Sequence, residues 1–285
     1  MPGRLMMSAN NVWDSKSRYY NLMTLMEVNG TNLQLDAIPL HPDDVVLDVG
    51  CGPGRVAIQA AKRVKKVICL DSSEKMLMEC RQNCEAAGVT NVEYVLADWE
   101  QVEMGKTIPE VDVAILARFG VPTSYEKLQK TARKCAVSIV WAKGAPGLPQ
   151  SSGKLFHGCY SQDDMERYPQ LRPPRTLSFP EPGSDEGKSR EELLTEPLPY
   201  GGAAIKERMD ALHVECHVTT VEEGWDRLFQ TKEEAYDWLI QLSGHPELVD
   251  AERFHQNVDS CLTKREDGWY FFLPTASDVV WFQTR

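Results

Sequence analysis

Long apolar runs are missing from the sequence. The longest, such as 45–47 and 137–142, are far too short to cross a bilayer. The first residues also lack the sustained apolar segment and the small-residue cleavage site of a secretory signal. We therefore expect a cytoplasmic protein without membrane association. The composition, with 42% hydrophobic and 26% charged residues, is typical of a globular protein.

Clusters of Lys and Arg are missing as well. The net charge is −11 at pH 7, and no stretch concentrates the basic side chains. Because binding to a phosphate backbone draws its affinity from such clusters, a duplex DNA or long RNA substrate is disfavoured. Only a basic patch assembled by the fold would bring a nucleic acid back into consideration.

The eight cysteines form no Cys-x-x-Cys pair and no paired Cys/His cluster. Cys80 and Cys84 lie one helical turn apart, and Cys216 precedes His217. Small buried hydrophobic side chains are the more common role for cysteines spaced in this way. We therefore predict free thiols in a reducing compartment and no metal site.

Strand-like and helix-like patterns alternate through the first half of the chain. The predicted strands are 45–49, 67–70, 92–96, 111–116 and 137–142, and the helices between them are 55–64, one capped by Ser72 and one near 125–135. Such alternation is typical of a parallel sheet with crossover helices. Five strands at this spacing favour a doubly wound α/β sheet.

The rest of the chain is expected to surround that sheet. Residues 1–40 are predicted to form an N-terminal helical cap, and 41–145 the core. Residues 146–213 begin with a stretch rich in Pro, Gly and Ser, which we expect to form a wall or lid on the substrate side. Residues 214–285 are predicted to supply the closing strands with two inserted helices. These comprise a strand to 221, helices after 231 and from 246 to about 262, and a terminal hairpin of 268–273 and 278–282.

A glycine-rich turn follows the first predicted strand, in Val45-Val-Leu-Asp-Val-Gly-Cys-Gly-Pro-Gly-Arg55. Glycine is needed there because the turn is tight and a ligand must approach the backbone without meeting a Cβ. Asp71 ends the next strand, where a carboxylate accepts hydrogen bonds from the ribose hydroxyls of an adenosine. Asp98 ends the third strand and can accept the exocyclic amine of adenine, with the Trp99 ring alongside. Together these strand ends predict an adenosine site.

The spacing of the glycines distinguishes between the possible adenosine-containing cofactors. Nicotinamide dinucleotides prefer G-x-G-x-x-G/A, but here the last of these positions is Arg55, which is too large to let the helix approach the strand. A G-x-x-x-x-G-K-[ST] phosphate loop is also missing. Asp48 adds a negative charge near the turn, which repels a pyrophosphate and suits a ligand with an ammonium and a sulfonium. The pattern favours a sulfonium nucleoside.

Asp48-Val-Gly-Cys-Gly-Pro-Gly54, Asp71 and Ala97-Asp98-Trp99 resemble the class I, seven-stranded Rossmann-like methyltransferases over about residues 40–145. The resemblance implies a doubly wound Rossmann-like sheet of about seven strands, the last antiparallel, with an N-terminal helical lid and a C-terminal helical insertion. It implies S-adenosyl-L-methionine as the cofactor and S-adenosyl-L-homocysteine as the product. Gly50 and Gly52 would line the methionine moiety, Asp71 would bind ribose, and Asp98 would bind adenine with Met76 packed nearby.

The segment Trp13-x-x-Lys16-x-x-x-Tyr20 resembles the lid of small-molecule members of this family, in which the tyrosine approaches the cofactor. Aromatic residues of an amphipathic helix are otherwise more often part of the core. The cofactor site predicted from sequence comprises Tyr20, Asp48, Gly50, Cys51, Gly52, Asp71, Ser72, Met76, Asp98, Trp99 and Arg118.

Transfer of a methyl group from a sulfonium is an in-line displacement with a neutral leaving group. The protein mainly has to align the nucleophile, the methyl group and the sulfur. A general base is needed only when the nucleophile must lose a proton, so we assign no catalytic residue. Arg118 is predicted either to pair with an anionic substrate or the cofactor carboxylate, or to serve as a structural ion-pair partner. Tyr125, His157 and Tyr160 are further candidates for the acceptor side, although a structural role is the more common one for such isolated residues.

The acceptor class rests on Ala117-Arg-Phe-Gly120, at the end of the fourth strand. Amino-methylating nucleic-acid and protein enzymes of this class typically carry Asn/Asp-Pro-Pro-Tyr/Phe there. The departure favours a small-molecule acceptor, in a monomer or homodimer. An RNA or protein methyltransferase and a non-catalytic S-adenosylmethionine-binding protein are the alternatives. A basic groove beside the cofactor would favour RNA, whereas a closed acidic or apolar pocket would count against it.

Overall fold

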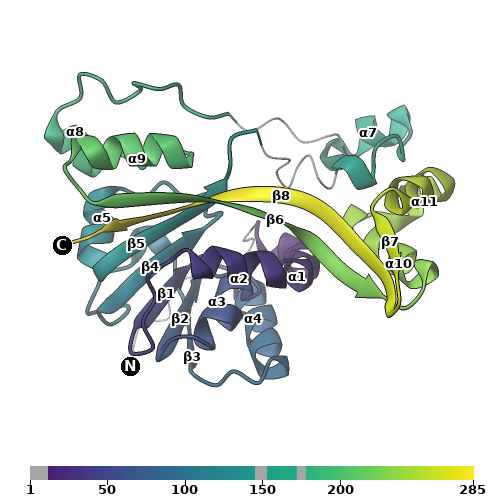
Figure 1. Cartoon of the computed structure of the whole chain (residues 1–285), viewed down its shortest axis with the longest axis horizontal. Coiled ribbons are helices and arrows are strands. Elements are labelled where there is room, and N and C mark those ends of the chain that lie inside the picture. The colour runs from purple at the N-terminus through teal and green to yellow at the C-terminus, as the bar shows by residue number, and fades with distance from the viewer. Residues whose placement is uncertain (1–11, 145–152, 172–177) are drawn as a thin grey trace.

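A single sheet organises the molecule. The computed structural model describes residues 12–144, 153–171 and 178–285. Within them eight strands pair in the order β3-β2-β1-β4-β5-β8-β6, with β7 beside β8 (Figure 1). The strands are β1 (Val45–Val49), β2 (Lys66–Asp71), β3 (Val92–Leu96), β4 (Val111–Ala117), β5 (Ala132–Trp141), β6 (Cys216–Phe229), β7 (Leu262–Arg265) and β8 (Gly268–Gln283). β1 to β5 are parallel, and β8 is antiparallel to β5 and β6. The predicted doubly wound sheet is confirmed.

Helices cover both faces of the sheet (Figure 1). Side chains of α2 (Val28–Asp36), α3 (Arg55–Ala61) and α4 (Glu74–Ala86) share one apolar layer with one face of β1 and β2. The opposite layer joins α5 (Tyr125–Thr131), α8 (Arg190–Thr195) and α9 (Gly202–Ala211). Successive strand residues alternate between the layers, as the twofold periodicity of a strand requires.

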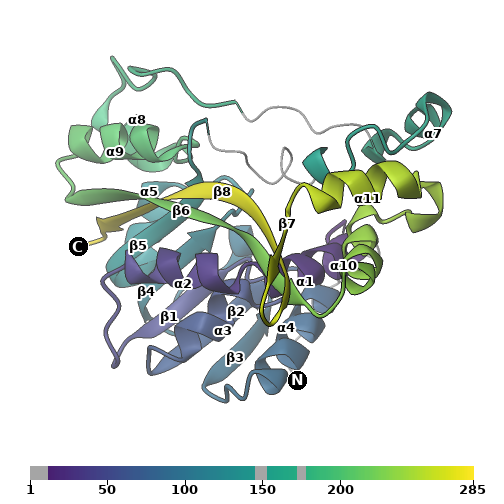
Figure 2. The same ribbon diagram turned by 45° about the vertical axis from the view of Figure 1, so that its right-hand side comes forward.

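The antiparallel pair β6–β8 extends well beyond the parallel strands and carries a third apolar core (Figure 2). This core combines the buried Trp225, Phe229, Phe254 and Phe271 with methionines of α1 (Ser17–Met26). It is completed by α10 (Lys232–Leu239) and α11 (Ala251–Asp259), while α7 (Gln162–Arg167) lies near α11 in both views. None of the described helices is long and apolar enough to cross a membrane.

The predicted terminal hairpin of 268–273 and 278–282 is wrong, because both halves belong to the single strand β8. β6 pairs with β8 without interruption from Trp269 to Phe282. Pro274 suggested a turn, but it lies between the part of β8 that pairs with β7 and the part that pairs with β5. One side of β8 has no partner strand there, and proline is tolerated at such an edge.

Other element boundaries also differ from the sequence prediction. Ser73, and not Ser72, caps α4 by accepting a hydrogen bond from the Met76 N–H. The helix expected from Pro246 is split into a short 3-10 turn and α11, which Asp250 caps. The N-terminal helical segment is likewise divided into α1 and α2 at Glu27.

Candidate functional site

The glycine-rich turn connects β1 to α3 and has a left-handed backbone at three positions. Gly50, Gly52 and Gly54 have φ values of 66°, 53° and 93°. A Cβ on Gly50 would lie 2.4 Å from the Phe119 ring, and one on Gly54 would lie 2.8 Å from the Cys80 Sγ. At Gly52, in contrast, no atom of the described residues other than its chain neighbours lies within 4 Å of that position. The turn therefore needs glycine for its conformation, and at Gly52 it leaves the backbone accessible.

A cavity of about 340 Å³ lies over this turn, at the carboxyl ends of β1 to β4. This is where ligands bind in open α/β sheets, and the volume lies within the usual range for small-molecule sites. Ten of the eleven cofactor residues predicted from sequence line it: Tyr20, Gly50, Cys51, Gly52, Asp71, Ser72, Met76, Asp98, Trp99 and Arg118. Residues that sequence reasoning did not assign also line it, among them Met23, Glu27, Arg55, Phe119 and Trp141.

Asp71 joins the turn to the end of β2. Its Oδ2 accepts a hydrogen bond of 2.9 Å from the Gly52 N–H, and its Oδ1 accepts one of 2.8 Å from the Ser73 N–H. Burial raises the pKa of this carboxyl, while the two backbone donors act in the opposite direction. The carboxylate is thus fixed in orientation at the cavity wall, and its remaining lone pairs can accept further hydrogen bonds.

Asp98 and Trp99 form another wall of the cavity. Asp98 is exposed and caps a short 3-10 turn by accepting a 3.0 Å hydrogen bond from the Glu100 N–H. The Trp99 ring is buried, and its Nε1–H donates to the Thr123 hydroxyl at 3.0 Å. Asp98 therefore serves as a local cap and still lines the cavity, so the two roles do not exclude each other.

Asp48 is the exception among the predicted cofactor residues, because it does not line the cavity. Its side chain is buried in the layer that α3 covers, and one carboxyl oxygen has no hydrogen-bond partner within the described residues. Burial raises its pKa to about 7, against the opposing effect of Arg55. A carboxyl beneath the turn, partly protonated at neutral pH, is not the ligand-facing charge expected from sequence.

Arg118 lies in a buried ion-pair network at the floor of the cavity. It pairs with Glu27 and, at 2.9 Å, with Glu223, and its guanidinium stacks on the Trp141 ring 3.5 Å from the centroid. Glu27 also pairs with Arg55 at 3.2 Å. Of the roles predicted for Arg118, the structure shows the structural ion pair. Its Nε and the Nη2 of Arg55 have no hydrogen-bond partner among the described residues.

Three candidates for the acceptor side lie outside the cavity. The Tyr125 hydroxyl donates to the Gln283 carbonyl at 2.8 Å, and its ring packs against Phe282 in the core. Tyr160 stacks on Phe156, and the His157 carbonyl accepts hydrogen bonds from Asn257 and Arg253. No described residue between 153 and 213 lines the cavity, so the described part of the Pro-rich excursion is not its wall.

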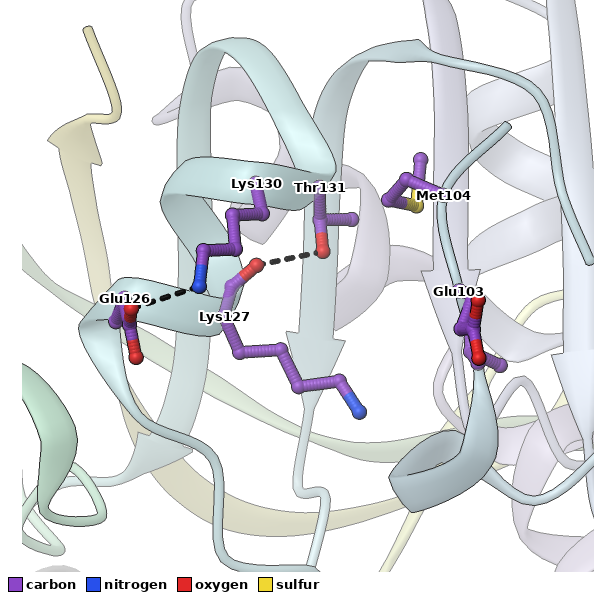
Figure 3. A pocket seen from close by; sticks show the side chains of 7 residues that line it. Glu103, Met104, Glu126, Lys127, Lys130 and Thr131 are labelled. Atoms are coloured by element: carbon purple, nitrogen blue, oxygen red, sulfur yellow. Dashed lines mark hydrogen bonds and ion pairs between the residues drawn. The ribbon is translucent and has the colours of Figure 1, made fainter. Parts of the chain in front are cut away.

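A second hollow, of about 400 Å³, lies between α5 and the segment after Trp99 (Figure 3). It shares no lining residue with the first cavity. Lys130 points to Glu126 with a 2.7 Å ion pair, and the Thr131 hydroxyl donates to the Lys127 carbonyl (Figure 3). It contains no glycine turn, so we assign it no part in cofactor binding.

Part of the chain is similar to known proteins. Residues 46–138 match the family model described as a methyltransferase domain. A 23S rRNA (uracil(1939)-C(5))-methyltransferase of Haemophilus influenzae is 30% identical over 94 residues, which is 31% of this chain and 22% of that protein. A probable cobalt-precorrin-6B C(15)-methyltransferase (decarboxylating) of Methanococcus maripaludis is 33% identical over 66 residues, 23% of this chain and 36% of that protein. The chain thus spans only a minor part of these curated relatives.

Among solved structures, the YcgJ protein of Bacillus subtilis aligns with a TM-score of 0.46 at 12% identity, covering 90% of this chain and 98% of that chain. The family match extends from β1 to β5 and includes the glycine turn, Asp71 and Asp98. The residues that line the cavity from α1 and its flanking segments, such as Trp13, Tyr20 and Glu27, lie outside the matched range.

Proposed function

We propose that the class I Rossmann-like methyltransferase domain of this chain transfers a methyl group from S-adenosylmethionine to a small-molecule acceptor. The cavity suits the cofactor, because no neighbour among the described residues lies within 4 Å of the Cβ position of Gly52, where a ligand would approach the turn. We assign Gly50 and Gly52 to the methionine moiety, Asp71 to the ribose, and Asp98, Trp99 and Met76 to the adenine.

S-adenosylmethionine supplies a methyl group already activated on a sulfonium, so the protein contributes mainly by orientation and exclusion of water. Tyr20 reaches the cavity from α1, and burial raises the pKa of its hydroxyl. A phenol of this kind stays protonated at neutral pH and acts as a hydrogen-bond donor, not as a base. We therefore propose that Tyr20 orients a ligand group and that α1 closes the cavity.

The observation that carries the small-molecule proposal is the lining of the cavity. Trp13, Tyr20, Phe119 and Trp141 give it an aromatic wall. The basic side chains on the cavity are Arg55 and Arg118, both paired with carboxylates, and no described lysine lines it. A cavity with an aromatic lining, in which the carboxyl groups outnumber the arginines, suits a small organic acceptor and offers little to a phosphate backbone.

RNA is the second candidate acceptor, since several of the curated relatives are named RNA methyltransferases. The match to the methyltransferase-domain model covers residues 46–138, and Trp13, Tyr20 and Trp141 of the aromatic lining lie outside it. Incubation of the protein with methyl-labelled cofactor and either a metabolite extract or total RNA separates the candidates. Label in the metabolite fraction is the expected result, and label confined to RNA would replace the small-molecule proposal.

Calorimetry with S-adenosylhomocysteine tests the cofactor site directly. Asp71→Asn replaces the carboxylate that would accept hydrogen bonds from the ribose hydroxyls. We therefore expect S-adenosylhomocysteine to bind about 10–100-fold more weakly, as the loss of a charge-assisted hydrogen bond predicts. Asp43→Asn is the matched control, because the Asp43 side chain is 89% exposed. Equal affinity of the two variants would contradict the assignment, and no binding by the unchanged protein would end the methyltransferase proposal.

A further inference from the structure

Three cysteine thiols converge beneath the glycine turn. Cys51 belongs to the turn, Cys69 to β2 and Cys80 to α4, and their Sγ atoms all lie within 4.8 Å of one another. All three residues are buried. In the part of the chain that the structure describes, no other three His, Cys, Asp or Glu side chains gather so closely. We propose that these cysteines form a binding site for a thiophilic divalent cation of the Zn²⁺ class.

The spacing of the sulfurs suits a metal ion. Three points no more than 4.8 Å apart share a centre no more than about 2.8 Å from each of them, and Zn–S bonds are about 2.3 Å long. Each sulfur therefore has to move by only about 0.5 Å to ligate an ion at that centre. A disulfide between any two of these cysteines would leave the third without a partner, whereas a metal ion uses all three.

Asp48 is buried on the same face of the sheet as the thiol of Cys69. It pairs with Cys69 in the register between β1 and β2, so the two side chains lie on the same face of the sheet. The carboxyl is 2% exposed, and its Oδ2 has no hydrogen-bond partner among the described residues. The Asp48 carboxyl is not itself a ligand of the proposed site, because the group of described side chains within 4.8 Å of one another holds the three cysteines alone. Cys84, one turn after Cys80 in the same core, is a further thiol close to the group.

An ion can reach the site from the cavity, because Cys51 lines it. Binding would replace the three thiol protons, which pass to the solvent, by bonds to the metal. The ligands come from the turn, from β2 and from α4, so the ion would tie together the elements that form the floor of the cavity. The site is therefore assigned a structural role and does not depend on the proposed reaction.

The test uses the full-length, reduced and metal-stripped protein. Zn²⁺ is titrated in competition with a chromophoric chelator, and Co²⁺ is added separately to record thiolate-to-metal charge-transfer absorption. We expect one ion per chain, a charge-transfer band, and a rise in melting temperature with Zn²⁺. Cys80→Ala should weaken Zn²⁺ binding at least about 100-fold, since loss of an outer-shell partner alone costs about 10–100-fold.

Cys216→Ala is the matched control, because Cys216 is buried but lies in the layer on the opposite face of the sheet. It should bind Zn²⁺ like the unchanged protein. Equal loss or equal retention of binding in both variants would overturn the proposal. If Cys80→Ala does not fold, as judged by circular dichroism, the unchanged protein decides alone: absence of a stoichiometric ion or of the Co²⁺ charge-transfer band refutes the site.

Discussion

Glu27 holds the junction of α1 and α2 against the floor of the cavity, and Glu27→Gln tests that role. The carboxylate pairs with Arg118 and with Arg55, and it accepts a 2.9 Å hydrogen bond from the Trp225 Nε1–H. Its side chain is 5% exposed, as against 12–13% for the two arginines. Glutamine keeps the shape and one acceptor oxygen but removes the charge.

The network contains two buried carboxylates, Glu27 and Glu223, and two arginines, so the substitution leaves one positive charge without compensation. Breaking a buried ion pair from one side costs about 3–5 kcal/mol. We therefore expect the free energy of unfolding to fall by that amount. For a domain of this size class the melting temperature should fall by roughly 6–20 °C.

Denaturant unfolding of Glu27→Gln and Glu126→Gln in parallel gives the measurement and its control. Glu126 pairs with Lys130 one turn along α5, and both side chains are largely exposed. Neutralising such a pair costs at most about 0.5 kcal/mol. If Glu27→Gln loses no more stability than Glu126→Gln, the buried network does not fasten α1 and α2 to the sheet, and the reasoning fails.

Three further predictions concern single residues. Gly52→Ala and Gly88→Ala should each lower the free energy of unfolding by about 1–2 kcal/mol, because both positions have a left-handed backbone and an unobstructed Cβ position. Only Gly52→Ala should also weaken the binding of S-adenosylhomocysteine, measured by calorimetry. Asp185→Asn should destabilise the protein by about 2 kcal/mol at pH 7, since Arg208 lowers the pKa of Asp185 to about 2. The difference in the free energy of unfolding between this variant and the unchanged protein should vanish as the pH falls from 4 to 2. Asp48→Asn should become more stable relative to the unchanged protein as the pH rises from 4 to 8, because the pKa of about 7 makes ionisation of Asp48 unfavourable in the folded state. The measurement is the free energy of unfolding of both proteins at several pH values in the presence of a chelator. A difference in that free energy that does not change with pH would contradict the prediction.

The sequence predicted the parts of the site that depend on neighbouring residues. The glycine turn and Asp98 follow strands and Asp71 ends one, and parallel strands bring their carboxyl ends to one edge of the sheet. The same reasoning failed at Asp48, because a charge near the turn in sequence lies under the turn in space. For Tyr125 the same reasoning favoured a structural role, and the hydroxyl indeed donates to the distant Gln283 carbonyl.

The periodicity of apolar residues and the spacing of glycines were enough by themselves to determine the doubly wound sheet and the position of its ligand cavity, because both are set within single strand–turn–helix units. Only the tertiary structure decided the partners of Arg118, which lie 91 and 105 residues away, and the meeting of three thiols from separate elements. It also decided that β8 runs on past Pro274. These features depend on which distant segments pack side by side, and long-range packing leaves no periodic trace in the local sequence.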